Sequence, residues 1–168
     1  MKTLFLTVFM SFSMFFCFAQ EKTKQQLKEE KKIAKQKQVQ SLIDSKEYEF
    51  VAVTAYPQGT RSIDMVSNPN YLRIKNDSVF SEMPYFGRAF AGVGYGGSGG
   101  LDFKGPVQDF SITKNKKDYT IKAKVKDNSD SYTIILTVFF EGNASLTINS
   151  VHRNSINYRG SIDKIIIK

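Results

Sequence analysis

The residue types that could do chemistry are few in this sequence. Its 168 residues include one His, one Cys and no Trp. One Cys excludes an internal disulfide and a zinc finger, and one His leaves almost no material for a His-based metal site or a Ser–His–Asp triad. The carboxylates of Asp64, Glu82, Asp102 and Glu141 show no paired spacing typical of a glycosidase. We therefore expect no metal and no cofactor. The pattern favours a non-catalytic protein, and a carboxylate-based, metal-independent hydrolase acting on envelope or dietary polymers is the alternative.

The strongest candidate for a binding site is an aromatic segment that leads into a Gly-rich run. Six of the eleven glycines lie within residues 92–100. Arg88 stands among aromatic residues, where its guanidinium must stack on a ring or pair with a carboxylate. We favour a structural clasp between Arg88 and Asp102, which would hold the Gly-rich loop to the body, over a ligand-binding Arg88. The ligand-binding candidates are Tyr85, Phe86, Arg88, Tyr95 and Asp102.

Residues 92–97 also fit the pattern G-x-G-x-x-G of dinucleotide-binding proteins. In those proteins the glycines lead into a helix whose N-terminus binds the phosphates. Here a strand is expected to follow at 101–103, so we exclude dinucleotide binding.

A second polar cluster contains His152, Arg153 and Tyr158. His152 follows an alternating strand, so its position is explained by strand register. No nucleophile elbow accompanies it that would make it part of a triad.

The elements that must position these residues are mostly strands. The clearest has Tyr119, Ile121, Ala123 and Val125 alternating with polar residues, as a strand with one buried face does. Short polar turns separate successive strands. The expected strands are 48–55, 71–75, 79–82, 101–103, 110–112, 119–125, 132–140, 146–148 and 156–167. We expect a single β-rich domain over residues 47–168, an antiparallel meander of about eight to nine strands forming a barrel or a sandwich.

Residues 20–46 form a basic arm, with eight Lys against four acidic residues from Glu21 to Lys46. Good helix formers dominate it, and we expect a helix of about 24 residues. Its apolar stripe is thin, so the helix should dock only by its last turns, and residues 21–40 should be dispensable for stability. The arm is either a solvated helix leading into the domain or the docking element of a structural or assembly subunit.

Residues 1–19 have the pattern of a signal peptide. A basic start precedes an apolar run too short to span a bilayer, and the small residues Cys17 and Ala19 precede a cleavage site before Gln20. The bulky Phe16 argues against a lipoprotein acylated on Cys17. We expect a periplasmic or secreted protein with no transmembrane segment after cleavage. The basic arm could bind nucleic acid, anionic lipid or an acidic envelope polymer, and export excludes nucleic acid as the partner. An unknown small ligand or an envelope partner is expected instead.

The sequence resembles an exported family of Bacteroidetes catalogued as domain of unknown function 4251. The resemblance covers nearly all of the chain after the arm, and its most specific part is Pro84-Tyr85-Phe86-Gly87-Arg88, although Met83 stands where Leu is expected. Further matching segments are Phe50-Val51-Ala52, Ala55-Tyr56-Pro57, Tyr71-Leu72, Gly100-Leu101-Asp102-Phe103, Phe140-x-Gly142-x-Ala144, Ser150-x-x-Arg153 and Ile156-x-Tyr158-x-Gly160. The resemblance implies export, a compact β-rich domain and a Gly-rich loop, and it implies no activity, substrate or cofactor.

Asp77-Ser78-Val79 is similar to the O-glycosylation acceptor of exported proteins in that group, which makes Ser78 a candidate modification site.

Overall fold

The computed structural model describes residues 23–90, 99–127 and 130–165. The chain divides into two units, residues 1–34 and 35–168. The expected signal peptide at 1–19, the glycine run at 92–97 and Tyr95 lie outside the described residues.

One helix, α2 (Lys24–Ser45), forms the described part of the basic arm. Its start is a capping box, because the backbone N–H of Gln26 donates to the Thr23 hydroxyl while the Gln26 side chain accepts from the Thr23 backbone N–H. In the second unit Val39, Leu42 and Ile43 are buried in the core. Docking by the last turns is therefore confirmed. That residues 21–40 are dispensable for stability stays a prediction, and Val39 within that range is only 1% exposed and belongs to the core.

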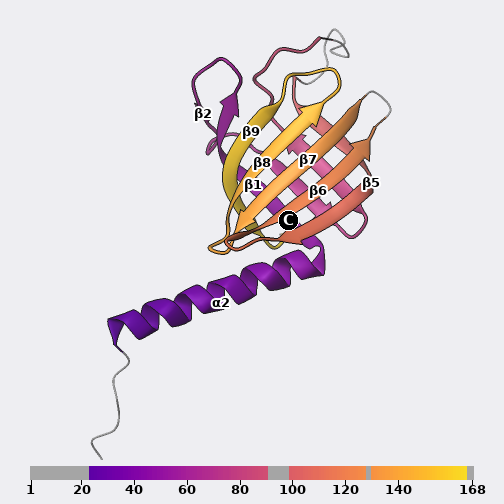
Figure 1. Cartoon of the computed structure of the whole chain (residues 1–168). Coiled ribbons are helices and arrows are strands. Elements are labelled where there is room, and N and C mark those ends of the chain that lie inside the picture. The colour runs from indigo at the N-terminus through magenta and orange to yellow at the C-terminus, as the bar shows by residue number, and fades with distance from the viewer. Residues whose placement is uncertain (1–22, 91–98, 128–129, 166–168) are drawn as a thin grey trace, which may run out of the picture. The chain divides into compact units, whose positions relative to one another are not determined.

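The strands of the second unit form a closed antiparallel barrel (Figure 1). They are β1 (Glu47–Pro57), β2 (Ile63–Asp64), β3 (Tyr71–Lys75), β4 (Ser78–Met83), β5 (Leu101–Lys114), β6 (Asp118–Lys126), β7 (Ser131–Phe139), β8 (Asn143–Ser150) and β9 (Ile156–Asp163). Eight strands follow each other around the barrel, β9 closes it against β1, and the short β2 is an extra strand beside β1. The expectation of an antiparallel β body after a basic helix is confirmed, and the architecture is the barrel.

The barrel interior is filled by the residues that alternate along each strand. In β6 the buried residues are Tyr119, Ile121, Ala123 and Val125, and the lysines between them are exposed. The same alternation runs through β4, β7 and β9, so one face of each strand supplies the core.

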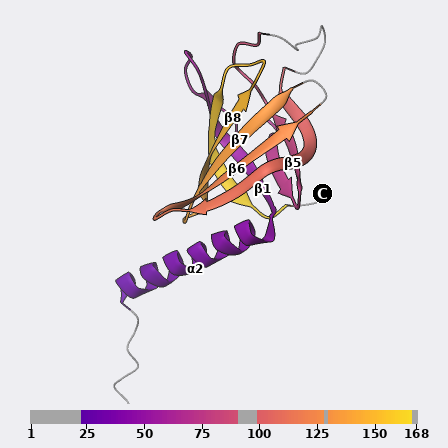
Figure 2. The ribbon, with the colours of Figure 1, turned by 45° about the vertical axis from the view of Figure 1, so that its right-hand side comes forward.

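The long strand β5 replaces the two short strands expected at 101–103 and 110–112. Its register to β6 shifts between Gln108 and Ser111, and Asp109 within this bulge has a φ of 52°. Its carboxylate lies 2.8 Å from the Lys124 ammonium on β6. A bulge bends a strand without ending it, and Figure 2 shows β5 curving along the wall of the barrel.

Candidate functional site

Two segments that are far apart in the sequence meet at the end of the barrel where β8 leads into β9 (Figure 1). The backbone N–H of Phe90 donates to the carbonyl of His152 at 2.7 Å, and that of Asn154 donates to the carbonyl of Arg88 at 3.1 Å. Between them, Ala89 and Arg153 form an antiparallel bridge. We call residues 84–90 and 151–154 together the cap. Arg88 of the first predicted cluster thus lies beside His152 and Arg153 of the second.

Tyr85 holds the two halves of the cap together. Its hydroxyl oxygen lies 2.8 Å from the carbonyl oxygen of Arg88 and 3.1 Å from that of Asn154. A Cβ atom at Gly87 would lie 2.3 Å from this hydroxyl oxygen, so glycine is required for the ring to fold back over the turn. Burial raises the pKa of Tyr85, while the charge of Arg153 acts in the opposite direction. The hydroxyl therefore stays protonated at neutral pH and can donate.

Arg153 performs the clasping role that the sequence suggested for Arg88. Its Nη1 donates to the carbonyl of Gly100 at 2.5 Å and to that of Gly99 at 3.4 Å, and its guanidinium carbon lies 5.3 Å from the centroid of the Tyr85 ring. Arg88 has an exposed side chain, and within the described ranges no ion pair joins it to Asp102. The sequence suggested this role for Arg88, and the contact with Gly99 and Gly100 is made by Arg153, because the strand connections bring residue 153 to the residues that precede β5.

The remaining predicted site residues lie close to the cap in different roles. Tyr158 is fully buried and its hydroxyl donates to the carbonyl of Pro84 at 2.8 Å. Phe86 is half-buried against the core, and His152 is half-buried with its backbone N–H bonded to the Ser150 hydroxyl. Asp102 is exposed on β5, where its register partner is Glu82 on β4. Asp102 is therefore a residue of the outer wall next to the cap.

Asp130 and Asn154 are cap-supporting residues that the sequence did not reveal. The Asp130 carboxylate accepts hydrogen bonds from the Ser150 hydroxyl and from the backbone N–H of Val151, which fixes the start of the β8–β9 connection. Asp130 lies in a polar stretch whose composition is typical of an ordinary turn. Among the described residues the hydrogen bonds of Asn154 are made by its backbone, and these leave no signal in the residue type.

The cap presents apolar and cationic groups to solvent. The side chain of Phe90 is 72% exposed and that of Val151 is 70% exposed, and Arg88 is exposed on the same segment as Phe90. Across the residues that the structure describes, no group of three or more His, Cys, Asp or Glu side chains is placed to hold a metal ion. The polar side chains of Tyr85 and Arg153 are used to fix the backbone of the cap.

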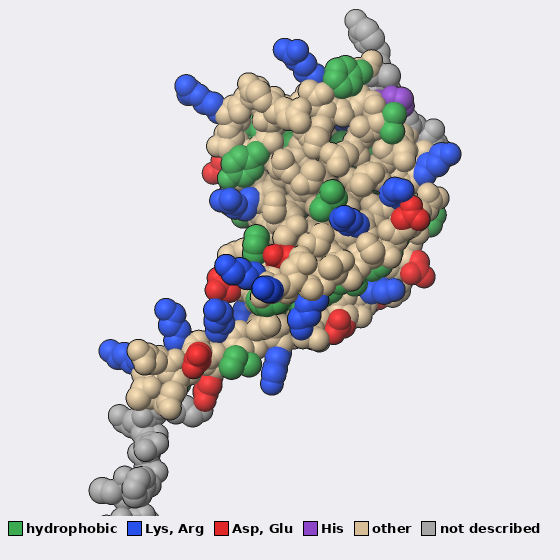
Figure 3. Space-filling model, viewed as in Figure 1, with side chains coloured by type: hydrophobic (Ala, Val, Ile, Leu, Met, Phe, Trp, Pro, Cys, Tyr) green, Lys and Arg blue, Asp and Glu red, His purple; other side chains and the backbone are tan. Residues whose placement is uncertain are grey.

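On the face of the molecule that Figure 3 shows, Lys and Arg side chains stand apart, with acidic and hydrophobic side chains among them. In the described part of the chain, no helix combines the length and apolar character needed to cross a membrane.

Ser78 lies at the opposite end of the barrel from the cap. It is the first residue of β4, directly after the hairpin turn at Asn76 and Asp77, and it is half-buried while Asp77 is exposed. Its O-glycosylation remains a prediction.

Comparisons with known proteins give a family and a fold. Residues 30–162 match the family model described as "Domain of unknown function (DUF4251)". The crystal structure of a DUF4251 family protein from Bacteroides eggerthii DSM 20697 is similar with a TM-score of 0.61 and 19% sequence identity, covering 78% of this chain and 88% of that chain. At this identity the similarity supports the fold alone. No curated protein matches the sequence.

Proposed function

The chain belongs to the DUF4251 family, and from this premise we propose that it is an exported, non-catalytic binding protein whose barrel presents the cap to an envelope partner. The observation that carries the proposal is the exposure of Phe90, at 72%, on a backbone that is itself hydrogen-bonded to His152. An exposed aromatic ring on an ordered backbone is typical of a binding surface.

The chemistry of the cap indicates the kind of partner. Phe90 and Val151 offer apolar area, and the exposed Arg88 guanidinium offers several donors that suit a carboxylate. We propose that the partner is a protein segment with an apolar anchor beside an acidic residue. The cap is held in place by the Tyr85 and Arg153 contacts, so little ordering is needed on binding, which favours affinity.

Export rests on the leader pattern of residues 1–19. A periplasmic or secreted location would bring the cap into contact with envelope proteins. Intact-mass measurement of protein from the native host tests this part, with a mature chain starting at Gln20 as the expected result.

The binding proposal is tested with Phe90→Ala and Arg88→Ala, compared with Phe139→Ala as a control. Phe139 is 43% exposed at the end of β7 and takes no part in the cap. Photo-crosslinking in the native host, with a crosslinker at Val151, should give a defined partner band that both cap variants lose and the control retains. A band that survives both cap substitutions, or no band at all, would contradict the proposal.

A further inference from the structure

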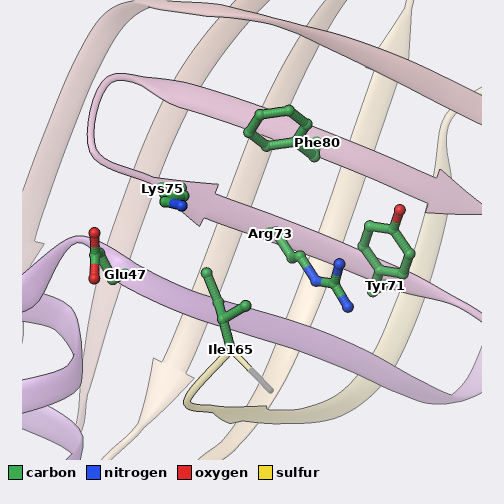
Figure 4. A pocket seen from close by; sticks show the side chains of 6 residues that line it. All are labelled: Glu47, Tyr71, Arg73, Lys75, Phe80 and Ile165. Carbon is green, nitrogen blue, oxygen red and sulfur yellow. The ribbon is translucent and has the colours of Figure 1, made fainter. Parts of the chain in front are cut away.

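A shallow groove on the outer face of the barrel shares no lining residue with the cap. It has a volume of about 290 Å³. Figure 4 shows that its side chains come from β1, β3 and β4 and from Ile165 just after β9. The lining residues are Glu47, Tyr71, Arg73, Lys75, Phe80 and Ile165.

Two aromatic rings connect this groove to a second hollow. Tyr71 and Phe80 line the groove and also line an adjoining hollow of about 430 Å³, which continues onto β5 as far as Lys104. Phe80 is 38% exposed, and its register partner on β3 is Arg73. The two rings therefore lie along one extended, open depression that crosses neighbouring strands.

The side chains around the rings are fixed before any ligand arrives. The Arg73 Nε lies 2.8 Å from the Glu49 carboxylate, and the Arg73 guanidinium carbon lies 4.0 Å from the centroid of the Tyr71 ring. Burial and the neighbouring Glu82 carboxylate raise the pKa of Tyr71. The Arg73 guanidinium, held by Glu49, restricts the movement of the Tyr71 ring, which lowers the entropy cost of binding.

The charges along the depression are mixed, although the whole chain carries +8. Carboxylate acceptors come from Glu47, Glu82, Asp102 and Asp127, and cationic donors come from Arg73, Lys75 and Lys104. An anionic ligand would meet the carboxylates and a cationic ligand would meet the lysines. A sugar hydroxyl is both donor and acceptor, so it can bind either kind of group. The C–H faces of a sugar ring are apolar and can pack flat on exposed aromatic rings.

We propose that this depression binds a neutral oligosaccharide, with Phe80 and Tyr71 as stacking platforms. The site is separate from the cap and does not depend on the function proposed for the cap. The open shape suits a linear chain that lies across β3 and β4.

The experiment is isothermal titration of the full mature chain with neutral hexasaccharides, namely cellohexaose, xylohexaose, maltohexaose, laminarihexaose and mannohexaose. We expect at least one of them to bind. Phe80→Ala should weaken that binding about tenfold or more, since a stacked ring is lost. Phe80→Tyr keeps the ring and should retain binding, and Phe139→Ala, which removes an exposed ring outside the depression, should have no effect. Thermal melting of each variant checks that it is folded.

The proposal would be overturned if no hexasaccharide binds at millimolar concentration. It would also be overturned if Phe80→Ala leaves the binding unchanged, or if the protein binds dextran sulfate and none of the neutral sugars. Sedimentation velocity provides the last test: a dimer that Phe80→Ala dissociates would assign this face to a second copy of the chain.

Discussion

The hydroxyl of Tyr85 lies 3.1 Å from the carbonyl oxygen of Asn154, a residue 69 positions later in the chain. It also lies 2.8 Å from the carbonyl oxygen of Arg88. A hydroxyl has a single proton, so it is shared between two carbonyl acceptors that belong to the two halves of the cap. This one side chain therefore links the segment after β4 to the connection before β9.

Tyr85→Phe should loosen the cap while the barrel stays folded. The ring and its packing remain, and the two carbonyl oxygens lose a donor at a part-buried position, which should cost about 1 kcal/mol of unfolding free energy. Hydrogen exchange should show faster exchange at the backbone N–H groups of Phe90 and Asn154, with the strand amides unchanged. Unchanged protection at both amides would contradict the linking role of Tyr85.

The two arginines of the cap should respond differently to substitution. Arg153→Ala removes the donors to Gly99 and Gly100 and the contact with the Tyr85 ring, so we expect a loss of about 1–2 kcal/mol. Arg88→Ala should change the unfolding free energy by no more than about 0.5 kcal/mol, because its side chain is exposed. Chemical denaturation measures both. Equal losses of unfolding free energy, or a larger loss for Arg88→Ala, would contradict the clasping role of Arg153.

The local pattern of the sequence predicts most of the strands, because each strand has one buried face. In β6 the apolar residues from Tyr119 to Val125 alternate without a fault, and the structure buries that side. The bulge in β5 is different. The bulge depends on Asp109 adopting a φ of 52° close to Lys124 on the neighbouring strand. This is a property of two paired strands, so the spacing of apolar residues along β5 alone does not predict it.

The closure of the barrel and the cap could not be read from the sequence for a related reason. Barrel and sandwich differ here by the pairing of β1 with β9, which joins residues more than a hundred positions apart, such as Phe50 and Ile162. The cap is built largely from backbone hydrogen bonds, as between Phe90 and His152, and residue types do not encode these directly. The aromatic, Arg and Gly composition singled out residues 84–90 as a candidate site, and the strand topology places Arg153 next to Gly99 and Gly100.

Gly160→Ala should destabilise the barrel strongly. A Cβ atom at Gly160 would lie 1.9 Å from the backbone carbonyl oxygen of Val51, beside the bulge where the β1–β9 register shifts. The strands would have to separate locally, and overpacking of this kind costs about 1–3 kcal/mol or more. Gly99→Ala is the matched control, because a Cβ there would meet no atom within 4 Å. Equal melting temperatures for the two variants would contradict the close approach of β1 and β9.

Truncation of the arm should separate its solvated part from its docked part. Residues 24–34 are all exposed, whereas Val39, Leu42 and Ile43 are buried in the core. A mature chain starting at Lys35 should therefore keep its unfolding free energy within about 0.5 kcal/mol. A chain starting at Lys46 loses the three buried side chains, each contributing about 2 kcal/mol, and should be severely destabilised or unfolded. A stable chain starting at Lys46 would show that the helix is not part of the core.

The two most deeply buried tyrosines should respond in opposite directions to removal of the hydroxyl. The Tyr158 hydroxyl donates to the Pro84 carbonyl, so Tyr158→Phe should cost about 1 kcal/mol. The Tyr48 hydroxyl is buried with no partner among the described residues, so Tyr48→Phe should be neutral or stabilise by about 1 kcal/mol.

Alkaline pH provides a second measurement on the same variants. Burial raises the pKa of both hydroxyls above the ordinary value of 10.0. Above pH 10 these tyrosines ionise in the unfolded chain while they stay protonated in the folded one, so the stability that they contribute is present below pH 10 and is lost as the pH rises. Each tyrosine contributes a slope approaching about 1.4 kcal/mol of unfolding free energy per pH unit.

Urea denaturation from pH 9 upwards should therefore show a shallower decline of the unfolding free energy for Tyr48→Phe and for Tyr158→Phe than for the unsubstituted chain. The lysines titrate in the same range in every variant, so only the difference between curves is assigned to the tyrosine. Parallel curves would mean that the substituted hydroxyl is open to solvent, and would contradict the burial of that tyrosine in the barrel interior.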